Sequence, residues 1–198
     1  MTTIIRLARQ DDATQVLGIY APIVEKLATS FELEPPDAAE MQQRIGETLV
    51  QWPWLVCERA GAVLGYAYAS QHRARPAYRW SVDVSVYIHA DARRMGLGRA
   101  LYTSLFEILS LQGYFNAYAG IALPNPGSVG LHEALGFKAV GVYHQVGYKL
   151  GAWHDVGWWQ LALQPKAPAP EAPKGLADVQ QAGGWKAAFA AGEALLKA

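Results

Sequence analysis

The sequence predicts an α/β domain in which a central strand leads directly into an amphipathic helix. Residues 82–88 alternate and then run through β-branched and aromatic side chains, which is typical of a strand inside a sheet. Residues 97–108 carry leucine or isoleucine at steps of three and four, which is the apolar stripe of a helix. Further strand and helix patterns lie on both sides of this pair. We therefore expect a sheet flanked by helices.

The N-terminal part predicts one strand and one helix. Residues 4–8 form the strand, and Asp11 or Asp12 caps a helix with an apolar face. Pro22 is expected to bend or end that helix, because proline lacks the N–H that the helix needs. Phe31 follows on a connecting segment, where it either anchors the segment in the core or forms part of a substrate wall.

A second helix and a hairpin come next. Asp37 with Glu40 three residues later resembles a capping box, and apolar residues then step by four. The apolar runs 54–58 and 62–70 flank a turn at residues 59–61, so they predict a hairpin.

The last part of the globular region predicts three strands and a short helix. Residues 114–123 form a strand, and a proline-rich turn then opens a helix that ends at Gly136. Strands follow around residues 139–145 and 153–163. We therefore expect a domain over residues 1–164.

The composition changes after this domain. Residues 165–174 are rich in proline and alanine, which predicts a semi-rigid linker. Residues 175–198 form an Ala/Gly-rich tail with a weak amphipathic pattern. The tail is either a frayed terminus or a short helix that docks on the domain or on a partner.

Composition and charge exclude several classes of function. The formal net charge is zero, so nucleic acid is not an expected partner, because binding to phosphates needs a clustered basic excess. No run is long enough to span a membrane, and the first residues lack the pattern of a secretory signal. The single cysteine, Cys57, agrees with a reducing compartment and sits in an apolar strand, where we expect it to be inert. We therefore expect a cytoplasmic protein.

The joint between the central strand and its helix, residues 93–98, predicts a phosphate site. Gly96 and Gly98 would cost stability in the first turn of a helix, unless something must approach the backbone closely. Free N–H groups at a helix start also bind anions such as phosphate. The spacing matches neither a P-loop nor a Rossmann glycine motif. On these residues alone, an ordinary turn remains the alternative.

The joint resembles the Arg/Gln-x-x-Gly-x-Gly/Ala signature of the GCN5-related N-acetyltransferases. A second stretch, residues 125–137, places Asn125, Ser128 and His132 at intervals that resemble that family's second signature. The segments TSFELEPP, RARPAY and GYKLGAWHDVGWWQL are similar to the phosphinothricin, arsinothricin and methionine sulfone acetyltransferases, and the likeness spans residues 4–163. The resemblance implies a mixed, mostly antiparallel sheet that is splayed between its two central strands.

The resemblance also implies where acetyl-CoA binds as co-substrate. N–H groups of the joint would hold its diphosphate, and the strand before the joint would bond its pantetheine arm. The implied residues are Val86, Tyr87, Arg93, Arg94, Met95, Gly96, Leu97, Gly98, Arg99, Asn125 and Ser128. No metal is expected, because the histidines show no ligand spacing and the cysteine is alone.

Two catalytic residues are implied. Asp83 corresponds to a glutamate that serves the family as general base, but it is one methylene shorter, which favours a bridging water. His132 lies where the family has a tyrosine that protonates the departing thiolate, and a histidine here is also proposed as a base. From the residues alone, Asp83 could equally be a carboxylate held by neighbouring polar groups, and His132 a helix residue bonded to a backbone carbonyl.

The implied substrate pocket combines an aromatic wall with cations. Its residues are Phe31, Arg73, Arg75, Tyr78 and Val156. Guanidinium groups bind carboxylate or tetrahedral oxyanions in bidentate fashion. A solvated loop is the alternative for the basic segment.

The leading functional prediction is N-acetylation of the α-amine of a phosphinothricin- or arsinothricin-like glutamate analogue, which would confer resistance. A second has the same chemistry with methionine sulfone, methionine sulfoximine or another free amino acid. A third is a non-catalytic module that retains acetyl-CoA. The resemblance also implies a homodimer, with aromatic residues of the last strand either in the core or on the dimer surface.

Overall fold

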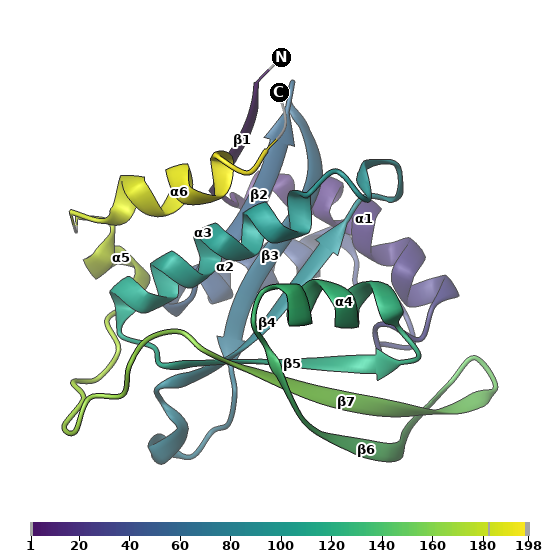
Figure 1. Ribbon diagram of the computed structural model, residues 1–198. Helices are drawn as coiled ribbons and strands as arrows, with labels where there is room; N and C mark the ends of the chain where they lie inside the picture. The colour runs from purple at the N-terminus through teal and green to yellow at the C-terminus, as the bar shows by residue number, and fades with distance from the viewer. Residues whose placement is uncertain (1, 182, 197–198) are drawn as a thin grey trace.

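The computed structural model describes residues 2–181 and 183–196. Its strands form one mixed sheet in the order β1-β2-β3-β4-β5-β7-β6, in which only β4 and β5 run parallel (Figure 1). This confirms the expected mixed, mostly antiparallel sheet. The strands are β1 Thr3–Leu7, β2 Trp54–Arg59, β3 Ala62–Gln71, β4 Ser81–Ile88, β5 Asn116–Leu123, β6 Lys138–Lys149 and β7 Ala152–Ala162.

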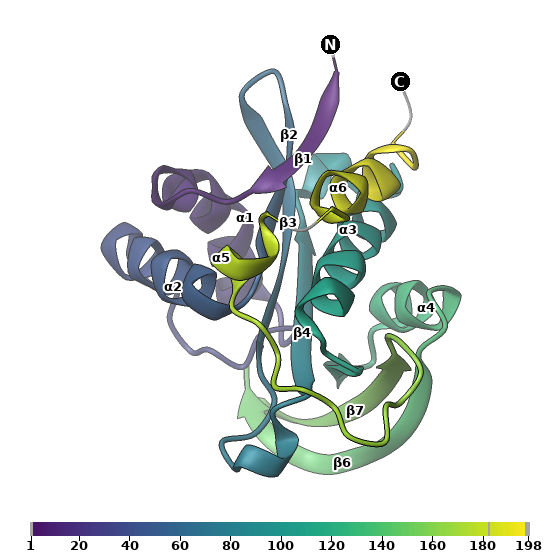
Figure 2. The ribbon, with the colours of Figure 1, turned by 90° about the vertical axis from the view of Figure 1, so that its left-hand side faces the viewer.

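Helices cover both faces of the sheet. Figure 2 shows α1 and α2 on one side of β2, β3 and β4, with α3 and α6 on the other. The helices are α1 Ala13–Lys26, α2 Ala38–Gln51, α3 Leu97–Gln112, α4 Pro126–Ala134, α5 Leu176–Val179 and α6 Trp185–Glu193. None of the described helices has the length and apolar character required to cross a membrane.

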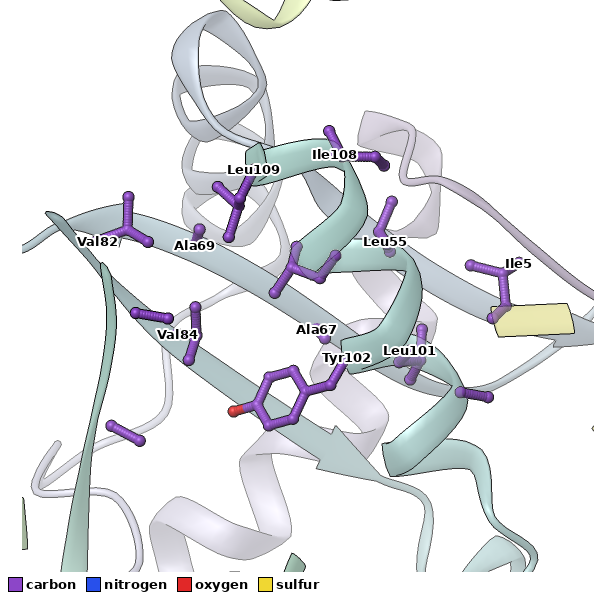
Figure 3. Packing of buried hydrophobic residues seen from close by; sticks show 14 of the residues in the cluster. Ile5, Leu55, Ala67, Ala69, Val82, Val84, Leu101, Tyr102, Ile108 and Leu109 are labelled. Atoms are coloured by element: carbon purple, nitrogen blue, oxygen red, sulfur yellow. The ribbon is translucent and has the colours of Figure 1, made fainter. Parts of the chain in front are cut away.

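Each face has its own buried apolar cluster. Ile45 and Tyr66 belong to the cluster on the α1 and α2 side. Leu55, Leu101 and Ile108 belong to the cluster under α3, where the apolar stripe of the helix packs on the strands (Figure 3). The stripe read from the sequence is therefore the buried face of α3.

The sheet opens between β4 and β5. The two strands pair only through three residues each, from Ser81 with Asn116 to Asp83 with Tyr118. Beyond Asp83, β4 continues to Ile88 along β3, and β5 continues along β7. The splay is thus confirmed, and its fork lies at Asp83.

Local signals explain several boundaries. The β2–β3 hairpin turns through Ala60 and Gly61, which both have positive φ, as a two-residue hairpin loop requires. The side chain of Asp37 accepts a hydrogen bond from the N–H of Glu40 at 2.8 Å and so caps α2, as predicted.

Two expectations for α1 need correction. The helix does not end at Pro22, which was one of the two expected outcomes, but continues for four residues beyond it. Burial of Ile23 and Val24 offsets the lost hydrogen bond. Asp12 precedes α1 without capping it. Its carboxylate instead accepts hydrogen bonds from Arg6 and from the N–H of Arg9.

The tail packs against the domain. Helix α6 lies along α3 beside β1 (Figures 1 and 2). The N–H of Ile5 donates to Glu193 Oε1 at 2.9 Å, so α6 satisfies part of the open edge of β1. Leu176, Val179 and Ala188 are buried in the cluster under α3.

Candidate active site

The N-terminus of α3 presents free backbone donors. The N–H of Ala100 donates to the carbonyl of Gly96 at 3.0 Å, so the N–H groups of Leu97, Gly98 and Arg99 come before this bond and have no carbonyl of the helix to bond. Gly96 has φ +82° and no side chain caps the helix. A methyl group on Gly98 would lie 3.1 Å from Leu131 of α4, so a larger residue would crowd this turn. The arrangement suits an anion such as a diphosphate.

The residues just before this turn are open to solvent. Arg93 is exposed, and Arg94 adopts φ +63°. Arg94 and Met95 line a hollow together with Arg59 and Leu196. Leu97 lines the same hollow, so basic side chains lie close to the start of α3.

The open stretch of β4 contains the two residues predicted to bond the pantetheine arm. Val86 and Tyr87 pair with β3 but lie beyond the last pairing with β5. The ring of Tyr87 stacks near Tyr66 and meets Tyr20 edge-on, which fixes this part of the strand. One edge of the β4 backbone is thus available beside the start of α3.

Asp83 stands at the fork and is bonded to a histidine that the sequence reading did not single out. His72 Nδ1 lies 2.6 Å from Asp83 Oδ1. The contact is a diagonal one across the strand pair: Gln71 pairs with Val82, so the next residue, His72, continues the register opposite Ser81, two residues from Asp83 on the same face of the sheet. Burial raises the pKa of the Asp83 carboxyl, and the hydrogen bond from His72 opposes that rise.

Aromatic rings hold the His72 ring in place. It stacks on Tyr118 with centroids 4.3 Å apart and planes at 13°. Tyr78 and Trp158 meet it edge-on at 6.0 and 6.3 Å. Tyr118 is also the β5 partner of Asp83, so the residue that stacks on His72 is held next to Asp83 by strand pairing.

His132 is buried and bonded at both ring nitrogens. Its Nδ1 lies 2.8 Å from the carbonyl of Ser128, so this nitrogen carries the proton and donates. Nε2 then accepts from the Tyr102 hydroxyl at 3.1 Å. The residue is 2% exposed, and burial lowers the pKa of its imidazole. This matches the alternative of a helix histidine bonded to a backbone carbonyl.

The other residues of the second signature organise α4. Asn125 caps the helix by accepting from the N–H of Ser128 at 3.1 Å. Leu131 on the same helix lies against Gly98. The two signatures are thus brought together, although Asn125 and Ser128 bond within α4.

The predicted substrate residues lie on different elements around the fork. The Arg73 guanidinium lies 5.7 Å from the centre of the Trp158 ring, and Arg75 is exposed. Tyr78 is 45% exposed and faces His72. These side chains share the loop that leads into β4.

Phe31 and Val156 border the region from the other elements. A methyl group on Gly147 of β6 would overlap the Phe31 ring, so the ring rests directly on the strand. The preceding Ser30 is held between α1 and β6, because it bonds the Tyr20 hydroxyl and accepts from Lys149 Nζ. Val156 pairs with Ala122 and Tyr143 inside the sheet.

Catalysis by a cysteine thiolate or by a metal ion finds little support in the described residues. Cys57 is buried, and burial raises the pKa of its thiol to about 11, so the reactive thiolate is disfavoured. No group of three or more His, Cys, Asp or Glu side chains in residues 2–181 and 183–196 is placed to hold a metal ion.

Comparison with protein families gives a match over most of the chain. The sequence profile of the acetyltransferase (GNAT) domain matches residues 5–158. The chain is 41% identical over 170 residues to phosphinothricin N-acetyltransferase of Streptomyces viridochromogenes, a match that covers 85% of this chain and 93% of that protein. It is 37% identical over 172 residues to L-methionine sulfoximine/L-methionine sulfone acetyltransferase of Pseudomonas aeruginosa, covering 86% and 100%.

A solved structure extends the comparison to the fold. Phosphinothricin acetyltransferase of Sinorhizobium meliloti, crystallised with acetyl-CoA, superposes with a TM-score of 0.82 at 36% identity. The superposition covers 86% of this chain and 94% of that one.

Proposed function

The chain belongs to the GNAT acetyltransferase family and is an acetyl-CoA-dependent N-acetyltransferase, and from this premise we propose that its acceptor is the α-amine of a phosphinothricin-like amino acid. The observation that carries the proposal is the fork at Asp83, the last residue of β4 that pairs with β5, which places a carboxylate at the point where the sheet opens. An amine on one side of that opening can meet a thioester held on the other.

Acetyl-CoA supplies an acetyl group as a thioester, which a free amine can attack. The residues present fit this co-substrate, because Leu97, Gly98 and Arg99 offer N–H donors to a diphosphate and Val86 lies on the open strand edge. The main chain near Val86 would also stabilise the oxyanion that forms during attack.

The proposed role of Asp83 is to drive deprotonation of the substrate. An ammonium group has no lone pair, so a base must remove a proton before attack. Aspartate is shorter than glutamate, which favours an intermediary between its carboxylate and the amine.

The acid role proposed for His132 carries a condition. Both ring nitrogens are hydrogen-bonded, so a proton could reach the thiolate only through the Tyr102 hydroxyl or after that bond opens. His132→Gln would test it: an acid role requires a fall in kcat, whereas a purely structural role lowers stability and leaves kcat of the folded enzyme near normal.

Arg73, Arg75 and Tyr78 are proposed to hold the acidic end of the substrate. A phosphinate or arsinate gains from a guanidinium, whereas the neutral end of methionine sulfone gains less. Arg75→Ala should therefore reduce kcat/KM by about tenfold or more for an anionic substrate, the value of one charge-assisted hydrogen bond, and less for a neutral one. Equal losses would favour the methionine sulfone alternative.

The direct test is a thiol-release screen with acetyl-CoA. Phosphinothricin, arsinothricin, methionine sulfone, methionine sulfoximine and ordinary amino acids are compared, with mass detection of each N-acetylated product. The proposal expects the highest kcat/KM with the phosphinothricin-like amino acids, for which acetylation would confer resistance. Thiol release with none of them would contradict it.

A homodimer in the cytoplasm is part of the proposal. Val140, Val142, Tyr148 and Trp153 are 41–61% exposed on the β6–β7 hairpin, whose outer strand β6 forms one edge of the sheet. Sedimentation equilibrium of the wild type and of Val142→Lys would test the dimer. A monomer at micromolar concentration in both would exclude it.

A further inference from the structure

The His72–Asp83 pair has the geometry of a base with its orienting carboxylate. Nδ1 donates to the carboxylate at 2.6 Å, which fixes the neutral ring in the tautomer with its lone pair on Nε2. In the described part of the chain, Nε2 makes no hydrogen bond. Its side chain is 11% exposed and that of Asp83 is 28% exposed, so the pair is shielded yet reachable.

The aromatic side chains around His72 fix its ring by packing rather than by hydrogen bonds. Stacking on Tyr118, with Tyr78 and Trp158 at its edges, leaves the imidazole few orientations. A carboxylate behind a histidine also stabilises the imidazolium that forms when the ring takes a proton. Imidazole is, in general, a stronger base than carboxylate and better matched to neutral pH.

We propose that His72 is the general base of the acetyl transfer and that Asp83 acts through it as a positioning residue. The proposal rests on the proposed function, because it names the group that removes the proton in that reaction. His72 takes the place of the bridging water expected from the short Asp83 side chain.

The ammonium group gives one proton to His72 Nε2, and this proton passes to solvent between turnovers. The amine nitrogen then attacks the thioester carbon, so a C–N bond forms and the C–S bond breaks. The second proton lost from the nitrogen ends on the sulfur, and the products are the amide and the free thiol.

Several titratable or charged groups face the pair and bear on its pH dependence. They are Tyr78 on the preceding loop, Tyr118 on β5 and Arg73 next to the ring. Burial and the charge of Asp83 raise the pKa of Tyr118, so this phenol stays protonated through the neutral range.

The test is His72→Gln in the full chain. Glutamine can still donate a hydrogen bond to Asp83, but it cannot take up a proton at neutral pH. We expect kcat to fall about a hundredfold or more, with KM for acetyl-CoA unchanged. The inflection that the base gives to the acidic side of the kcat/KM profile should disappear, so that the rate simply follows the fraction of free amine. Asp83→Asn should add little to the loss in the double variant, because both residues serve one proton transfer.

His144→Gln is the matched control. His144 also pairs with an aspartate, at 3.1 Å from Asp155, but its side chain is 78% exposed. This variant should keep the wild-type rate and pH profile. If His72→Gln stays within threefold of the wild type and keeps that inflection, the proton acceptor is not His72 and the proposal is overturned. A wild type that releases no thiol would instead contradict the proposed function.

A second variant covers the case in which His72→Gln does not fold. His72→Ala leaves a space lined by Tyr118, Tyr78 and Trp158. Added imidazole should restore the rate in proportion to its concentration, which a merely structural role would not produce. A rate that does not respond to imidazole would overturn the proposal.

Discussion

Two glycine-to-alanine substitutions in helices should have opposite effects on stability. A methyl group on Gly192 of α6 would overlap Ser104 Oγ and the carbonyl oxygen of Ala100, and it would lie 2.9 Å from Ile5. A methyl group on Gly18 of α1 would meet nothing within 4 Å. The chemical change is the same, so the difference isolates the contact between α6 and α3.

The magnitudes follow from helix propensity and overpacking. Replacing glycine by alanine inside a helix gains about 0.5–1 kcal/mol where space is free, so Gly18→Ala should stabilise the fold by that amount. Overpacking costs about 1–3 kcal/mol, and the backbone oxygen of Ala100 cannot turn away as a side chain could. Gly192→Ala shares the propensity gain, so the two variants should differ by the overpacking cost of about 1–3 kcal/mol, and this cost should make Gly192→Ala destabilising.

Urea unfolding followed by tryptophan fluorescence measures both variants against the wild type. The midpoint should rise for Gly18→Ala and fall for Gly192→Ala, with similar slopes. A Gly192→Ala variant that is stabilised like Gly18→Ala would refute the close packing of α6 on α3.

Three further predictions concern the site. Gly96→Ala strains a backbone with φ +82° by about 1–2 kcal/mol, so it should lower kcat/KM for acetyl-CoA up to about tenfold. The variant should leave kcat/KM for S-acetylpantetheine unchanged, because that thioester lacks the diphosphate. The control Gly61→Ala, at φ +81°, should leave both values unchanged, and an equal loss with both thioesters in Gly96→Ala would count against a diphosphate site at the start of α3. Because burial lowers the pKa of His132, the unfolded chain takes up a proton more readily below the ordinary histidine pKa of about 6.5. The free energy of unfolding should thus fall as pH drops through that range, and this loss should shrink in His132→Gln, as denaturant titrations at several pH values would detect. Gly147→Ala should displace Phe31 and raise KM for the amino acid about tenfold, the value of roughly 1–2 kcal/mol of apolar contact, while KM for acetyl-CoA stays constant.

The sequence predicted those features of the fold that depend on local patterns. Periodicity predicts the strand that ends at Ile88 and the apolar stripe of α3. Residue type predicts the helix cap at Asp37 and the turn at Gly61. The uncapped start of α3 was predicted for the same reason, because two glycines there indicate a close approach to the backbone.

Features that depend on long-range pairing could not be predicted in this way. His72 reaches Asp83 only because β3 and β4 pair in one register, and a shift of one residue would turn the strand's side chains to the opposite face. The course of α1 past Pro22 depends on apolar burial against the sheet. The docking of α6 depends on Gly192, whose missing side chain gives no apolar signal in the sequence.

The measurement that tests the central claim most directly is a titration with acetyl-CoA followed by amide chemical shifts. The free N–H groups of Leu97, Gly98 and Arg99 should show the largest changes, and coenzyme A without the acetyl group should reproduce them because it carries the same diphosphate. Binding that leaves these three amides unchanged would contradict the claim that the start of α3 holds the co-substrate beside the open sheet.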